Sequence, residues 1–216
     1  MASYVETAGM ATDTEPVGLL TEGAAGIAAI VLSIIALAGV SSSALASIAA
    51  IVIGVGLMVQ GFNTAAENLR LPPVGGVAEF GGEVMVDFLG GGAGIVLGVL
   101  GLIGLSPAYL LAAALIVFGG ALLLSGALSL RTRVAAMGPT GQMIAMSGSA
   151  ATGGVELLMG TAAVVLGILA LVAGGPHAAI LLLVGYIVVG AAMLIVSATF
   201  GAALMRVFAQ GTVTAE

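Results

Sequence analysis

Apolar residues along the chain form six long runs, separated by short polar or glycine-rich segments. The runs cover about residues 22–40, 44–62, 86–105, 108–130, 153–173 and 178–203. Each is close to the ~20 apolar residues that a helix needs to cross a bilayer. The runs are continuous and rich in Ala, Leu and Gly, whereas the strands of a transmembrane barrel would alternate. The pattern therefore predicts an all-α membrane protein with six transmembrane helices.

The six runs fall into three similar pairs, each beginning with an acidic residue four positions before a glycine. These acidic residues are Glu22, Asp87 and Glu156, and an offset of 65 residues aligns the first two pairs without a gap. The third pair needs two extra residues at its turn. Such self-similarity predicts tandem helical hairpin repeats. We assign the hairpin repeats to residues 22–70, 87–135 and 156–206, a polar tail to 1–21, linkers to 71–86 and 136–155, and a C-terminal tail to 207–216.

Composition and charge place the chain in a membrane and suggest its orientation. Mean hydropathy is +1.30 and only 6% of residues are charged, whereas soluble domains have about 25%. All four basic residues (Arg70, Arg131, Arg133 and Arg206) follow an even-numbered run. The positive-inside rule then predicts that both termini face the cytoplasm. The net charge of -6 and the absence of lysine argue against nucleic acid as a partner.

Small residues recur on one face of each predicted helix. Gly26, Gly91 and Gly160 begin such stripes in the first helices of the three pairs, and Gly54, Gly119 and Gly190 hold equivalent places in the second helices. Small residues let helix backbones approach closely in lipid. We expect the small faces to meet within each hairpin and the three hairpins to form one closed bundle. The larger aliphatic faces should contact lipid or a neighbouring subunit.

Two interpretations of the repeated acidic residues remain open. In the first, each carboxylate lies in the first turn of its helix, where the helix dipole favours it. It would also pair with an arginine of its own hairpin: Glu22 with Arg70, Asp87 with Arg133 and Glu156 with Arg206. In the second, the three acids form the entry of a proton or cation pathway, since ionisable groups within the membrane often mark such pathways.

Catalytic chemistry finds little support in the sequence. The chain has no cysteine, and its one histidine, His177, lies at the predicted turn between the fifth and sixth runs. There is no nucleophile triad, metal-binding histidine pair or phosphate loop. We therefore expect no enzyme activity, cofactor or metal. His177 is expected to be a simple turn residue, with a sensor of acidification as the alternative.

The three tandem hairpins together carry the pattern that resembles a known family. Over roughly residues 22–206, an apolar run, a tight turn and a second run such as Ile116-Val-Phe-Gly-Gly-Ala-Leu-Leu-Leu-Ser-Gly126 resemble the HdeD-like acid-resistance membrane proteins. The resemblance implies a prokaryotic inner-membrane protein linked to acid or stress response, with no catalytic residues. The lysine-free composition and the acid that opens each repeat depart from that family. We predict a structural or accessory subunit, as a homo-oligomer or part of a larger membrane complex; the alternative is a small proton or cation channel or transporter.

Overall fold

Six α-helices make up the described part of the computed structural model, whose backbone is described for residues 15–70, 77–136 and 149–211. Side chains are described for residues 21–62, 65, 82, 84–128 and 153–198. The helices are α1 (Glu15–Leu37), α2 (Ser42–Arg70), α3 (Val77–Leu102), α4 (Pro107–Ala136), α6 (Ser149–Ala173) and α7 (Gly175–Gly211). The predicted all-α fold is confirmed for these residues. Residues 77–86 and 149–155 of the predicted linkers belong to α3 and α6, and residues 15–21 and 207–211 of the predicted tails belong to α1 and α7. Residues 1–14, 71–76, 137–148 and 212–216 lie outside the described part.

Five of the helices are long and apolar enough to cross a bilayer. They contain the spans Ser42–Phe62, Val84–Leu102, Pro107–Leu128, Gly153–Ala173 and Gly175–Ala198, and α1 adds a shorter apolar stretch, Thr21–Leu37. A lipid environment suits these helices. Their outward-facing side chains are apolar, and every backbone polar group inside a helix has a hydrogen-bond partner within the same helix. The chain is therefore a multi-pass α-helical membrane protein.

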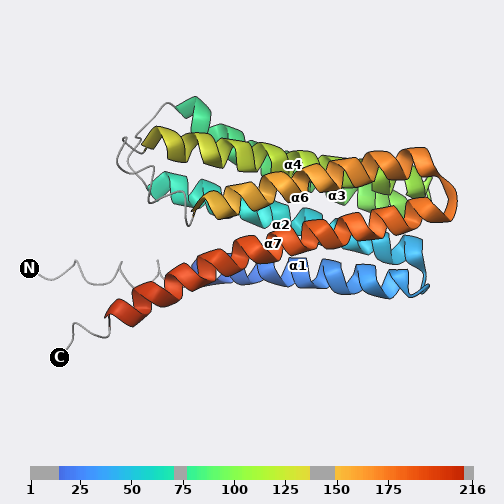
Figure 1. The fold of residues 1–216 in the computed structure, drawn as a ribbon, viewed down its shortest axis with the longest axis horizontal. Helices are drawn as coiled ribbons and strands as arrows, with labels where there is room; N and C mark the ends of the chain where they lie inside the picture. The colour runs from blue at the N-terminus through green and yellow to red at the C-terminus, as the bar shows by residue number, and fades with distance from the viewer. Residues whose placement is uncertain (1–14, 71–76, 137–148, 212–216) are drawn as a thin grey trace, which may run out of the picture.

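Short turns join three pairs of helices at one end of the molecule (Figure 1). Gly39 (φ 93°) and Gly104 (φ 91°) take left-handed conformations just after α1 and α3, which end those helices at little steric cost. Their amides donate to the carbonyls of Ala36 and Gly101, each at 3.1 Å. The third connection is tighter than predicted. Because α7 already begins at Gly175, His177 is an exposed residue of the first helical turn.

The helices pack as an inner group of three and an outer group of three. Helices α2, α4 and α7 contact one another, while α1, α3 and α6 each pack against two of the inner helices. The first and last helices, α1 and α7, lie side by side (Figure 1). The six helices thus form a closed bundle, with a larger share of buried residues in the inner helices than in α3 and α6.

Four layers of apolar side chains fill the space between the inner helices. From the turn end inward they are Ala46, Leu111 and Leu182; Ala50, Leu115 and Tyr186; Ile53, Phe118 and Val189; and Leu57, Leu122 and Met193, all of them buried. Their spacing of four, three and four residues keeps them on one face of each helix. The centre of the bundle is therefore apolar and closed over most of its length.

One buried hydroxyl ties two inner helices together. Tyr186 of α7 donates a hydrogen bond of 2.9 Å to the carbonyl oxygen of Leu111 in α4. We expect Tyr186→Phe to lower the free energy of unfolding by about 1 kcal/mol, since a net hydrogen bond is lost without a change in ring volume. Denaturant titration in mixed micelles would measure it. Tyr109→Phe is the matched control, because Tyr109 is 66% exposed; equal losses in both variants would contradict the assignment.

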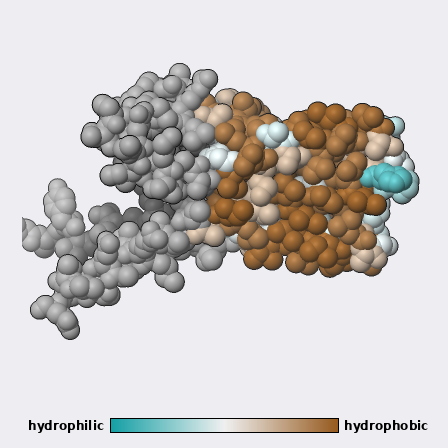
Figure 2. Space-filling view, in the orientation of Figure 1, coloured by the Kyte–Doolittle hydropathy of each residue, from teal (hydrophilic) through white to brown (hydrophobic). Residues whose placement is uncertain are grey.

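The outer surface of the described part is almost entirely apolar. Figure 2 shows a continuous hydrophobic band with polar residues near the end that carries the short turns. Large aliphatic side chains such as Ile34, Val96 and Ile168 are about half exposed. Exposed apolar area of this extent requires lipid or another apolar partner, in agreement with the predicted position of the aliphatic faces.

Candidate functional site

Pairs of glycines bring the backbones of neighbouring helices into contact at three places. A Cβ atom added at Gly54 of α2 would lie 2.7 Å from the carbonyl oxygen of Gly91 in α3. The same distance separates a Cβ at Gly119 of α4 from the Gly160 oxygen in α6, and a Cβ at Gly26 of α1 from the Gly190 oxygen in α7. We call these three contacts the glycine seams. Only a residue without a side chain permits such an approach.

The glycine seams do not lie where the sequence analysis placed them. Each joins helices of different predicted hairpins, so the expectation that small faces meet within a hairpin is wrong. Inside the pair α3 and α4, Gly94 instead packs against the ring of Phe118. The physical reason is that a stripe of small residues defines a face but does not specify its partner. The large central side chains of the inner helices fill the space between the two helices of a predicted hairpin. Close backbone approach is therefore possible only between helices of different hairpins.

The three repeated acidic residues are all buried in the bundle. Glu22, Asp87 and Glu156 are 3%, 1% and 6% exposed. They lie seven, ten and seven residues after the first residues of α1, α3 and α6. The prediction that they occupy the first turn is therefore wrong, because these helices extend further toward the polar side than their apolar runs. Stabilisation by the helix dipole is confined to the first turn and does not apply here.

Each acidic residue lies beside one of the glycine seams. A Cβ added at Gly61 of α2 would lie 3.3 Å from Cβ of Asp87, and one at Gly126 of α4 would lie 3.0 Å from Cβ of Glu156. Beside Glu22, a Cβ at Gly23 would lie 3.0 Å from the hydroxyl oxygen of Ser197 in α7. Asp87 and Glu156 thus face helices of a different predicted hairpin. The side chains of Arg70, Arg133 and Arg206 lie outside the described residues, so the proposed ion pairs stay a prediction.

Further polar groups lie at the same depth as the acids. Gln60 and Ser125 directly precede Gly61 and Gly126, and Ser125 is buried. Oε1 of Glu22 is buried and has no hydrogen-bond partner in the described part of the chain. We call Glu22, Gln60, Asp87, Ser125 and Glu156 the polar layer.

The polar layer does not have the geometry of a metal site. Among the side chains that the structure describes, no group of three His, Cys, Asp or Glu residues is placed to hold a metal ion. The acids come from three separate outer helices and each occupies its own seam. What they can do chemically is bind and release protons, or attract single cations to the polar end of the bundle.

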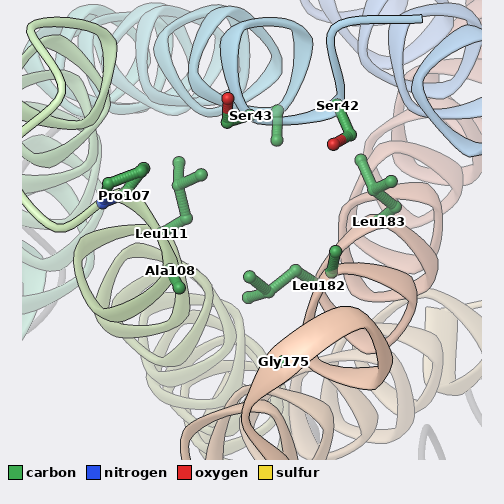
Figure 3. Close-up of a pocket in the computed structure, with 10 residues that line it drawn as sticks. Ser42, Ser43, Pro107, Ala108, Leu111, Gly175, Leu182 and Leu183 are labelled. Atoms are coloured by element: carbon green, nitrogen blue, oxygen red, sulfur yellow. The ribbon is translucent and has the colours of Figure 1, made fainter. Parts of the chain in front are cut away.

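A small cavity opens at the opposite end of the inner helices (Figure 3). Its volume is about 120 Å³, and its lining includes the first residues of α2, α4 and α7. We call this cavity the vestibule; its lining residues are Ser42, Ser43, Ala46, Pro107, Ala108, Leu111, Gly175, Ala179, Leu182 and Leu183. The sequence analysis did not predict the vestibule. The sequence signal for such a cavity was Ala46, because the equivalent positions in the other two predicted repeats hold the larger Leu111 and Leu182.

No family model, curated protein or solved structure matches the chain. The fold and the buried polar layer define a multi-pass α-helical membrane protein. Its function has to be argued from the geometry described above.

Proposed function

We propose that the protein is a structural or accessory membrane subunit. The observation that supports this most directly is the apolar filling of the bundle centre, where Ile53, Leu115, Phe118 and Tyr186 are fully buried. A conducting pathway needs polar lining or water along its length, and these layers provide neither. The glycine seams add rigid helix contacts around the closed centre, which suits a scaffold.

The finer features of the proposal rest on the sequence. We propose three tandem hairpin repeats, supported by the 65-residue offset and by glycine seams at equivalent positions. Both termini would face the cytoplasm of a prokaryotic inner membrane, given the positions of the arginines. The relation to HdeD-like proteins and to acid or stress response rests only on the sequence resemblance of the three hairpins, over roughly residues 22–206. The apolar outer surface supports a homo-oligomer or a place in a larger complex.

Purification in a lipid-preserving polymer tests the accessory role. We expect the protein to migrate with a defined larger assembly, either of several copies or with a stoichiometric membrane partner. Native mass spectrometry would give the composition. A monomer carrying only lipid, at the protein's native expression level, would contradict the accessory proposal.

A second candidate function is proton or cation transport through the polar layer. The observation in its favour is Glu22, whose buried Oε1 atom lacks a hydrogen-bond partner among the described residues. An uncompensated carboxylate at this depth is costly, and proton uptake would relieve that cost. The apolar centre would then have to open during transport.

Flux through proteoliposomes distinguishes the two functions. For an accessory subunit we expect proton and potassium flux equal to that of protein-free liposomes, because the four apolar layers block the bundle. Transport would instead give a flux that falls to background in Glu22→Gln, Asp87→Asn and Glu156→Gln. Glu6→Gln, in the polar N-terminal tail, is the control for the loss of one negative charge. Flux that depends on the three buried acids but not on Glu6 would establish transport.

A further inference from the structure

We propose that the vestibule is a binding site for a small uncharged molecule with a short alkyl body and one hydroxyl group, such as a short-chain alcohol. It lies at the turn end of the bundle, away from the polar layer (Figure 3). The proposal is independent of the accessory function, since it rests only on the shape and chemistry of the cavity.

The shape of the vestibule follows from one small residue in the first apolar layer. Where α4 and α7 carry Leu111 and Leu182, α2 carries Ala46. The next layer again has a small residue in α2, Ala50, opposite Leu115 and Tyr186. The resulting cavity of about 120 Å³ approaches the ~150 Å³ of an apolar cavity that binds benzene. A molecule of about five or six heavy atoms therefore fits.

The lining of the vestibule selects against charge. None of its residues is ionisable, and alkyl groups of Ala46, Leu111, Leu182 and Leu183 form most of the wall. A charged ligand would lose hydration there without compensation. Two hydroxyl groups, those of Ser42 and Ser43, lie at the edge of the opening in Figure 3. They can exchange hydrogen bonds with a single hydroxyl of the ligand while its alkyl body occupies the apolar wall.

The floor of the vestibule makes it a binding site and not a passage. Leu115 and Tyr186 in the layer below are fully buried, and the Tyr186 hydroxyl is held by the Leu111 carbonyl. Phe118 and Ile53 fill the layer after that. A ligand that enters from the turn end therefore stops after the first layer and leaves by the same route.

Cysteine protection tests the site, and the chain is suited to it because it contains no cysteine. In nanodiscs, the thiolate of Ser43→Cys attacks the sulfenyl sulfur of a neutral methanethiosulfonate, forming a mixed disulfide and releasing methanesulfinate. We expect 1-butanol to slow this reaction several-fold. Ala173→Cys, at the exposed end of α6 and outside the vestibule lining, should react at an unchanged rate. Equal slowing at both positions would overturn the proposal.

Filling the cavity and lengthening the alcohol complete the test. In the Ser43→Cys background, Ala46→Leu should abolish the protection by 1-butanol, and Ala179→Val, a smaller change in the same lining, should weaken it. Helicity measured by circular dichroism shows which of the two variants is folded. Protection should be lost with 1-octanol, which exceeds the cavity. Protection that survives cavity filling, or that increases with chain length as partition into the bilayer does, would overturn the proposal.

Discussion

Phe118→Ala is expected to lower the free energy of unfolding by about 3–5 kcal/mol, the usual cost of removing a buried aromatic ring. Phe118 is fully buried at the centre of the bundle. Its ring packs against Gly94 of α3, and its centroid lies 6.4 Å from that of Tyr186 in an edge-to-face arrangement. The substitution would leave a cavity bordered by α3, α4 and α7, and Gly94, which lies directly against the ring, has no side chain that could fill it.

Reversible unfolding in mixed micelles of a mild detergent and sodium dodecyl sulfate would measure this loss. Tyr109→Ala provides the control, because Tyr109 is 66% exposed on α4 and its ring stays largely outside the packed bundle. We expect the control to change stability by less than about 1 kcal/mol, as for other surface substitutions. A small effect at Phe118 would mean that the central layers are loosely packed.

Gly119→Ala is expected to destabilise the bundle by about 1–3 kcal/mol through overpacking. The added methyl group would lie 2.7 Å from the Gly160 oxygen and 2.8 Å from the Val164 nitrogen. Both atoms belong to the backbone of α6, so no rotamer change can relieve the contact. Helices α4 and α6 would have to separate along the whole seam.

The neighbouring glycine offers a closely matched control for that experiment. A Cβ atom at Gly120 meets nothing within 4 Å, although it belongs to the same helix. Gly120→Ala should therefore be neutral or stabilising, since alanine favours a helix over glycine by about 1 kcal/mol. Thermal unfolding of the two variants in nanodiscs would compare them. If both behaved alike, the close approach of α4 and α6 would be contradicted.

The number of helices and their apolar spans could be predicted from the sequence because the membrane imposes a length, whereas several helices extend seven to nine residues beyond those spans. Continuous apolar runs, broken at positions such as Gly39 and Gly104, give the spans and turns within a few residues. The partners of the glycine stripes could not be predicted. Gly54 lies on a small face in sequence, but its contact with Gly91 depends on how the bulky side chains of three inner helices share the centre.

The acidic residues show the same division between local pattern and tertiary arrangement. Their spacing from the following glycines correctly placed Glu22, Asp87 and Glu156 on packing faces, since all three are buried. Their position along the helices was predicted wrongly. The start of each apolar run served as the predicted start of the helix, whereas the helices begin several residues earlier. The vestibule could not be predicted either. In the sequence Ala46 is an ordinary helix residue, and the cavity beside it depends on its tertiary neighbours Leu111 and Leu182, which belong to other helices.

The contact of Gly26 with Gly190 joins the first helix to the last, which has a consequence for biosynthesis. Helix α1 leaves the ribosome long before α7, so its groove of small residues has no partner until translation of the final helix. A chain interrupted before α7 would present that groove to α7 of another molecule. Such a chain has no α7 to give in return, so premature termination should leave the groove of α1 unfilled or filled at the expense of an intact molecule, without a closed exchange dimer.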